Sequence, residues 1–278
     1  MLIGAPSSLR SAVARPLRHA VPALTCLDEP AQLSVALLSS AAGRGALAGA
    51  TVVFVTVPRP PGRGGLLRFR HQSARLAAGF EQAALAARCH GAARVIVLST
   101  AFVYDDDRGA PLRPGAPTVT AAETSAATAA EQAARMFTGA GGDCVVLRLG
   151  WTCGAGDAIT RRVLAAASRG WRLIDGDPGA CVAMLAEPDA ASAVEAALFA
   201  APGTYNVTDG WPITQSALNT RLEAAAGRLL HGLDEPRWGE GGVLFGPSRK
   251  ITSAAFTTLT GWRPRLTPAA DSLAAMLR

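Results

Sequence analysis

Apolar and polar residues alternate along the chain in blocks that predict short buried strands separated by helices. Residues 51–57 form a continuous apolar run, TVVFVTV, which ends at Pro58. Such a run is typical of a parallel strand that is buried on both faces. Residues 71–90 then place apolar side chains at helical spacing, and residues 95–98 form the next apolar run. The order strand, helix, strand predicts an α/β fold with a parallel sheet.

The second apolar run leads into polar residues that are candidates for chemistry. Ser99 and Thr100 stand at the predicted carboxyl end of this strand, and the acidic turn 105–107 follows shortly after. Ligands of open parallel sheets bind beyond the carboxyl ends of the strands. Thr100 is therefore well placed for a functional role, and an alanine-rich helix follows the turn.

The composition allows one large α/β domain or a domain with a small appendage. The chain has 278 residues, of which 49% are hydrophobic and 17% charged. The net charge is +6, but the basic residues are scattered and do not gather with aromatic residues on one helix. We therefore expect no nucleic-acid partner and assign some of the arginines to an anionic small-molecule ligand.

Cysteine and histidine usage indicates neither disulfides nor a metal site. The five cysteines are odd in number and widely spaced without a Cys-x-x-Cys motif, which is typical of a reducing cytoplasm. The four histidines lack metal-ligand spacing. No apolar run approaches the ~20 residues of a membrane span, and no signal peptide precedes the first strand. We expect a cytoplasmic protein without a membrane partner.

Several motifs in the right order resemble one known family. They are TAFVYD at 100–105, AAEQ at 129–132, GTYNVTDGWPIT at 203–214 and LTGWRP at 259–264. The chain resembles the extended short-chain dehydrogenases/reductases of the NAD-dependent epimerase/dehydratase type, over nearly its whole length.

This resemblance implies a Rossmann-like, doubly wound parallel sheet with a small C-terminal substrate lobe. Residues 1–156 would form the dinucleotide-binding domain. Residues 157–278 would form mainly the substrate-side lobe, with elements that return to the sheet. The resemblance also implies a homodimer through the helix that covers residues 123–137.

The catalytic helix departs from the family pattern. The family carries Tyr-x-x-x-Lys there, but Glu123 stands in the tyrosine place and Ala127 in the lysine place. The printed sequence contains two tyrosines and a single lysine, Lys250, and neither tyrosine stands four residues before it. A phenolate whose pKa is lowered by a nearby ammonium is therefore not provided by this motif.

The dinucleotide motif is degenerate as well. Gly4 holds the first glycine place of the resembled Gly-x-x-Gly-x-x-Gly loop, whereas Ser7 and Arg10 replace the second and third. Those glycines allow close approach of the backbone to the pyrophosphate and of the helix to the strand. Asp28 lies where an acid would meet the adenosine ribose, which favours NAD over NADP; its alternative role is a helix N-cap. NAD or NADP binding is thus open, and we expect no metal.

Five residues are candidates for contacting the substrate. Arg59 and Arg68 lie in the segment 58–70, which we predict to be an irregular loop, and could clamp a phosphate or carboxylate or simply form a solvated face. The resemblance places Trp151 and Thr152 beside the nicotinamide and substrate, although Trp151 could equally belong to the core. Tyr104 completes the set.

Three functions remain open. The first is an enzyme that performs acid/base chemistry without net redox, namely dehydration, cyclisation, epimerisation or isomerisation, on a small organic molecule of the specialised-metabolite kind. Thr100 would donate a hydrogen bond, and Glu123 or an acid of the turn 105–107, for which we choose Asp105, would act as acid or base. The second is a catalytically silent protein that senses NAD(P) or another ligand. The third is an NAD(P)-dependent oxidoreductase with a replaced proton donor.

Overall fold

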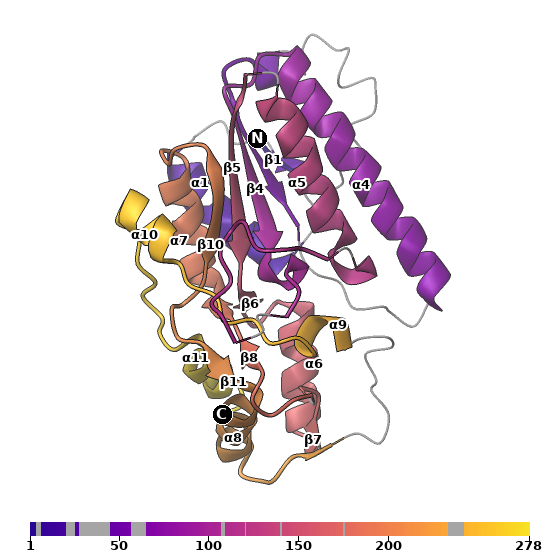
Figure 1. The fold of residues 1–278 in the computed structure, drawn as a ribbon, viewed down its shortest axis with the longest axis vertical. Coiled ribbons are helices and arrows are strands. Elements are labelled where there is room, and N and C mark those ends of the chain that lie inside the picture. Colours follow the sequence, from indigo (N-terminus) through magenta and orange to yellow (C-terminus); the bar gives the residue numbers. More distant parts are fainter. Residues whose placement is uncertain are drawn as a thin grey trace.

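A parallel sheet of six strands organises the molecule (Figure 1). The computed structural model describes residues 1–3, 7–20, 26–27, 45–56, 65–106, 109–119, 121–139, 141–174, 176–232 and 242–278. The strand order is β10-β5-β4-β3-β1-β2. The strands are β1 (Leu2–Ile3), β2 (Cys26–Leu27), β3 (Thr51–Val55), β4 (Arg94–Thr100), β5 (Asp143–Leu149) and β10 (Gly203–Val207). The predicted α/β, Rossmann-like fold class is confirmed.

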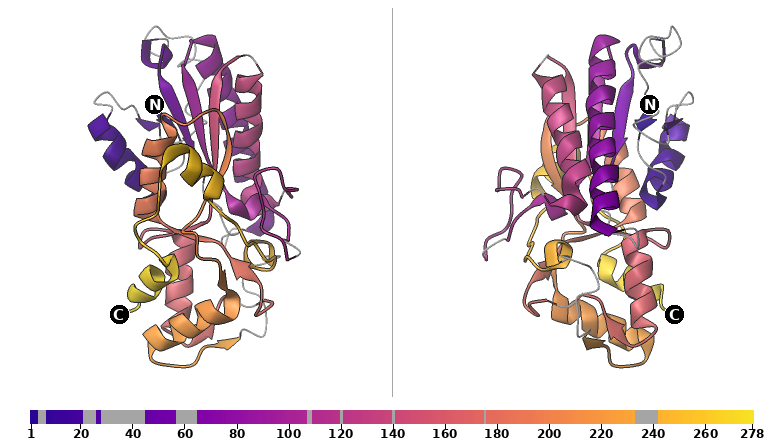
Figure 2. Two further views of the ribbon diagram at one scale, coloured as in Figure 1. Left: turned by 60° about the vertical axis from the view of Figure 1, so that its left-hand side comes forward. Right: turned by 90° about the vertical axis from the view of Figure 1, so that its right-hand side faces the viewer.

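Helices cover both faces of this sheet, as Figure 2 shows. On one face lie α1 (Ser8–Ala20) and α7 (Glu187–Ala197), and on the other lie α4 (Gly65–Cys89) and α5 (Ser125–Thr138). An apolar cluster lies on each face, the first under α1 and α7 and the second under α4 and α5. Along β4, Ile96 and Leu98 pack into the first cluster, whereas Val95 and Val97 pack into the second. Side chains alternate between the faces of a strand, so both faces of this strand must be apolar. This double burial explains the uninterrupted apolar runs in the sequence.

The prediction of an irregular loop over residues 58–70 was wrong for residues 65–70, which are helical. The helix α4 begins at Gly65, six residues before the predicted start at His71. Residues 66–70 (LLRFR) contain neither proline nor glycine, so nothing in them interrupts a helix. The backbone of Arg68 therefore belongs to α4 and not to an irregular loop.

The small lobe lies beyond the carboxyl edge of the sheet (Figure 1). It contains the helices α6 (Ala158–Ala167), α8 (Gln215–Ala226), α9 (Gly242–Phe245) and α11 (Ala269–Ala275). Its short strands pair as β8 (Cys181–Val182) with β11 (Ile213–Thr214), β7 (Trp171–Arg172) with β12 (His231–Gly232), and β6 (Trp151–Cys153) with β9 (Met184–Ala186). Ile159, Met184, Leu218 and Leu273 belong to the apolar cluster of this lobe.

Two late segments of the chain join the large domain. The strand β10 pairs with β5, and α10 (Ala254–Thr260) lies beside β10. The helix α7 packs against α1 through the first apolar cluster. The chain therefore crosses between the two parts several times, which brings sequence-distant residues to the edge of the sheet that faces the small lobe.

That edge is the expected ligand site of this topology. The strand order reverses at β1, which has β2 on one side and β3 on the other. Open α/β sheets bind ligands at such a switch point, beyond the carboxyl ends of the strands. The helix α1 follows β1 closely in sequence, so its N-terminus lies at this edge. Within the described parts of the chain, no helix combines the length and apolar character needed to cross a bilayer.

Candidate active site

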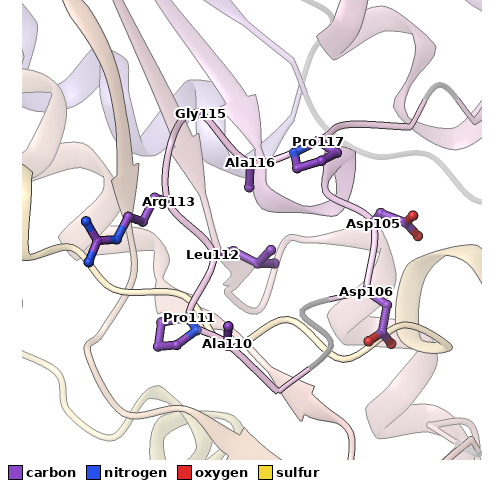
Figure 3. A pocket seen from close by; sticks show the side chains of 9 residues that line it. All are labelled: Asp105, Asp106, Ala110, Pro111, Leu112, Arg113, Gly115, Ala116 and Pro117. Atoms are coloured by element: carbon purple, nitrogen blue, oxygen red, sulfur yellow. The ribbon is translucent and has the colours of Figure 1, made fainter.

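A hollow of about 640 Å³ lies just beyond the carboxyl end of β4 (Figure 3). It is lined by Asp105, Asp106, Ala110, Pro111, Leu112, Arg113, Gly115, Ala116 and Pro117. Figure 3 shows the two acids on one side, Leu112 in the middle and the Arg113 side chain directed away on the other side. The hollow thus combines an apolar wall with charged groups at its border.

Backbone contacts hold the segment that forms this hollow. Thr118 pairs with Tyr104 in an antiparallel bridge, and Leu112 pairs with Ile251. The Leu112 N–H donates to the Lys250 carbonyl over 2.8 Å. The loop is therefore fastened both to the end of β4 and to a segment that arrives from the C-terminal part of the chain.

Asp105 is half-buried, and its side chain makes no hydrogen bond within the described part of the chain. Its carboxylate interacts electrostatically with Arg249, whose side chain is only 3% exposed. Burial lowers the pKa of Arg249 to about 10, and the negative charges of Asp105 and Asp106 oppose that shift. The guanidinium of Arg249 donates to the backbone carbonyls of Tyr104, over 3.0 Å, and Leu244, over 2.7 Å. Arg249 thereby fixes the turn from which Asp105 projects.

Thr100 is the last residue of β4 and is almost fully buried. Its Oγ1 accepts a hydrogen bond of 3.2 Å from the Phe102 N–H and so caps the short 3₁₀ helix η2 (Ala101–Val103). An accepting hydroxyl keeps its own proton, so this cap leaves Thr100 able to donate.

Glu123 lies in the 3₁₀ turn η3 (Ala122–Thr124) that leads into α5. Its side chain is 7% exposed and has no hydrogen bond or ion pair among the described residues. Glu123 does not line the hollow beside Asp105, so the structure leaves these two carboxylates as separate candidates. Ala127, at the lysine place of the family, is buried in α5.

Tyr104 is fully buried and belongs to a polar network behind the hollow. Its hydroxyl donates to Asn206 Oδ1 over 2.6 Å, and the Arg148 guanidinium lies over its ring. Arg148 makes hydrogen bonds of 3.0 and 2.8 Å to the Glu131 carboxylate, which also accepts from Ser99 Oγ. Burial raises the pKa of Tyr104, although Arg148 and Asn206 oppose the shift. The phenol is thus held neutral and in place.

Sequence reasoning missed the charged members of this network, but a signal for them exists. Arg148 stands in the apolar strand VVLRL, and Glu131 stands among alanines on the buried face of α5. A charge in such a place has to be paired, because an isolated buried charge is unfavourable. The two positions therefore predict each other as partners.

Trp151 and Thr152 lie in β6, and both side chains are buried. The Trp151 ring meets Phe245 edge to face with centroids 5.2 Å apart, and Phe245 meets Phe102 at 5.5 Å. The cavity left between them is only about 10 Å³, close to the minimum for one water molecule. Phe245, which sequence reasoning did not single out, thus fills this part of the cleft between β4 and the small lobe.

Ser7 and Arg10 mark the start of α1. Ser7 Oγ accepts from the Arg10 N–H over 3.1 Å, so this serine caps the helix. Gly4, Asp28, Arg59 and Asp107 lie outside the described residues, and of Arg68 only the backbone is described. The structure therefore brings Ser7 and Arg10 together at the helix start and leaves the other predicted ligands of the dinucleotide untested.

Ser8, the first residue of α1, forms a hydrogen bond with an acidic residue. Ser8 Oγ donates to Glu187 Oε1 in the first turn of α7, and the Glu187 side chain is almost buried. The pyrophosphate of a dinucleotide binds at this helix N-terminus in Rossmann folds. A carboxylate already hydrogen-bonded there opposes a second anion, so the described residues do not fit a bound dinucleotide at this point. Within the described ranges, no group of three or more metal-ligating side chains is present.

Comparison with known proteins shows the fold. No family model matches the sequence, and no curated protein is significantly similar to it. Among solved structures, a dTDP-glucose 4,6-dehydratase from Streptomyces venezuelae with NAD bound has a TM-score of 0.79 at 14% identity, over 100% of this chain and 95% of that one.

Two further structures agree over nearly full length. A UDP-glucose 4-epimerase from Thermus thermophilus in complex with NAD has a TM-score of 0.75 at 17% identity, with 100% and 99% of the two chains covered. A human epimerase-family protein with NADPH has a TM-score of 0.76 at 16% identity, with 99% and 98% covered. The chain therefore has the fold of epimerases and dehydratases of the extended short-chain type.

Proposed function

We propose that this protein is an enzyme that performs acid/base chemistry without net redox on a small organic molecule bound in the hollow beside Asp105. The observation that carries the proposal is this hollow of about 640 Å³ at the carboxyl edge of the sheet, with a carboxylate at its border. Ligand pockets typically measure ~300–1,000 Å³ and combine apolar walls with a few polar groups. Similar folds belong to a dTDP-glucose 4,6-dehydratase and a UDP-glucose 4-epimerase, which supports dehydration or epimerisation as the kind of reaction.

Asp105 is the proposed acid and base. Its carboxylate would take a proton from a carbon beside a carbonyl group, and the electron pair would move onto the carbonyl oxygen. Return of the proton to the other face gives epimerisation, and its transfer to a neighbouring hydroxyl expels water. Both outcomes balance without an external oxidant or reductant. Dehydration, epimerisation and the related isomerisations and cyclisations are therefore the proposed reactions, on a substrate of the specialised-metabolite kind.

Thr100 and Glu123 are the second and third proposed groups. Neither residue lines the hollow, so each would act only on a substrate that reaches beyond it. Thr100 would then donate its retained proton to a substrate oxygen, and the nearly buried carboxylate of Glu123 would serve as an alternative acid or base.

The test uses the full chain in deuterated buffer without added nicotinamide cofactor. A panel of nucleotide sugars, hydroxy ketones and hydroxy acids is incubated with the protein, and the products are followed by mass spectrometry for deuterium uptake or loss of water. We expect turnover that falls by ~10²–10⁴-fold in Asp105→Asn. The matched control is Asp271→Asn, which removes an exposed carboxylate that pairs with Arg221. Equal rates in both variants, or turnover that requires added NAD(P), would contradict the proposal.

A second function, that of a catalytically silent protein, is favoured by two observations. Phe245 closes the cleft beside Trp151, and the hydroxyl of Tyr104 is already bound to Asn206. A catalytically silent, ligand-sensing protein needs no open cleft there. The same panel separates the two functions, because a sensor would bind a compound and raise the melting temperature without changing the mass of that compound.

A homodimer through α5 is part of the proposal on the strength of the family resemblance. The helix α5 packs on α4, and its Met136 side chain remains 56% exposed. Sedimentation of the protein, with Met136→Lys as the disruptive variant, tests this assembly independently of any activity.

A further inference from the structure

The first turns of α1 and α7 share one carboxylate. Glu187 belongs to the first turn of α7, and its Oε1 accepts a hydrogen bond from Ser8 Oγ in the first turn of α1. The N-terminal ends of helices carry partial positive charge and favour negative groups. Glu187 is therefore a single anion that serves two helix ends at once.

The surrounding chain makes room for this carboxylate. A Cβ atom at Gly154 would overlap the Glu187 carboxylate, and a Cβ atom at Gly156 would lie 2.5 Å from Ser8 Cβ. Any other residue at these two positions would displace the acid or the helix start. The glycines that follow β6 are thus matched to the Ser8–Glu187 contact.

Among the described residues, no cationic side chain lies beside the Glu187 carboxylate. Burial raises the pKa of Glu187, and the Asp157 carboxylate raises it further, whereas the hydrogen bond from Ser8 lowers it. Burial first, and then the charges of Asp209, Asp157 and Glu187, raise the pKa of the Cys153 thiol to about 12. The helix ends and Ser8 are therefore the groups that stabilise Glu187 in its charged form.

We propose that Glu187 is an internal anion that occupies the phosphate-binding end of α1 and thereby selects against NAD and NADP. A dinucleotide brings two negative phosphates to this helix end, where the carboxylate already uses the Ser8 hydroxyl and the favourable field. Glu187 is thus a specificity-determining residue, and its effect does not depend on which reaction the hollow beside Asp105 carries.

The test is calorimetric titration of NAD⁺, NADH, NADP⁺ and NADPH into the full chain and three variants. Glu187→Gln removes the charge while keeping a group that can accept from Ser8, and Glu187→Ala removes the side chain. Glu195→Gln is the control, because Glu195 is an exposed acid of the same helix. Circular dichroism establishes that each variant is folded.

We expect weak or no binding to the unmodified protein and to Glu195→Gln, and a gain of at least about tenfold for one dinucleotide in Glu187→Gln. Glu187→Ala should gain as well. Tight binding to the unmodified protein would overturn the proposal. So would the same affinity in the unmodified protein and all variants, or the absence of binding in every one of them. This readout requires no substrate, so it is separate from the test of the reaction itself.

Discussion

Two buried polar regions of this molecule each stabilise a buried carboxylate, but they do so in different ways. Behind the hollow, Glu131 is paired with Arg148 through two hydrogen bonds. At the junction of α1 and α7, Glu187 is held by a serine and two helix ends, with Asp157 as a like charge nearby. The first region neutralises its charge and can serve only as a support. In the second, no cationic side chain among the described residues neutralises Glu187, which lies where the fold usually binds phosphate, so by the present proposal it decides what can bind.

We expect the largest loss of stability when the Glu131–Arg148 pair loses its cation. Burial alone would lower the pKa of Arg148, but the hydrogen bonds and charge of Glu131 outweigh it and raise that pKa. The variant Arg148→Met leaves Glu131 buried without its partner, and we expect the free energy of unfolding to fall by about 3–5 kcal/mol. Chemical denaturation measures this change.

The matched control for that variant is Arg221→Met, which breaks an exposed ion pair with Asp271. Exposed pairs contribute little, so a loss under about 1 kcal/mol is expected there. The double variant Arg148→Met/Glu131→Met should recover most of the lost stability, because both charges are then absent. Equal losses at Arg148 and Arg221 would show that the buried pair has no special role.

A smaller effect is expected from Tyr104, which links the network to β10. Removal of its hydroxyl in Tyr104→Phe leaves Asn206 Oδ1 without this donor, and we expect a loss of about 1–2 kcal/mol. Tyr205→Phe is the matched control, because its hydroxyl donates to the Ala201 carbonyl at the surface. That variant should change the unfolding free energy by less than about 0.5 kcal/mol, and a larger loss there than at Tyr104 would contradict the ranking.

We expect the smallest effect on stability at Glu187, where the substitution should increase the free energy of unfolding instead of lowering it. Because the folded-state pKa of Glu187 is raised, its protonated form contributes stability that is lost as pH rises from the ordinary value of 4.5 through the folded pKa. Glu187→Gln cannot lose this contribution. It should therefore match the unmodified protein at low pH and exceed its stability at neutral pH, by less than about 1 kcal/mol.

Denaturation curves at several pH values for Glu187→Gln and Glu195→Gln measure that difference. Among the described residues, the groups that interact with Glu187 are Ser8, Asp157 and the Cys153 thiol. Burial raises the pKa of Asp157 as well, so its titration will overlap the transition. Asp157 is present in both variants, so the comparison retains only that part of its titration which depends on the charge of Glu187. A neutral-pH loss of stability in Glu187→Gln alone would contradict the account of an uncompensated charge.

The sequence predicts the framework of the fold because the framework depends on local patterns. A strand buried on both faces has to be apolar throughout, which is why residues 51–57 and 95–98 identified β3 and β4 correctly. The start of α4 was misplaced because prolines and glycines ahead of Gly65 made the whole segment resemble a loop. Local signals thus located the elements better than their ends.

The site was harder to predict, because its residues meet through contacts that no local pattern encodes. Phe245 reaches Trp151 across about a hundred residues, and Arg249 reaches the backbone of Tyr104. Glu187 gave no signal as a ligand of α1, since its meaning depends on where Ser8 lies in space. Among these long-range contacts, the Glu131–Arg148 pair is the one that the sequence indicates, as two charges in otherwise apolar elements.

The central claim is that this Rossmann-like fold works without a bound dinucleotide, and native mass spectrometry tests it most directly. The purified full chain is measured as isolated and again after dialysis against NAD⁺ or NADPH, with Glu187→Gln measured in parallel. The account predicts that the unmodified protein retains neither dinucleotide, whereas Glu187→Gln retains one of them. An unmodified protein that carries one NAD or NADP per chain through purification would contradict it.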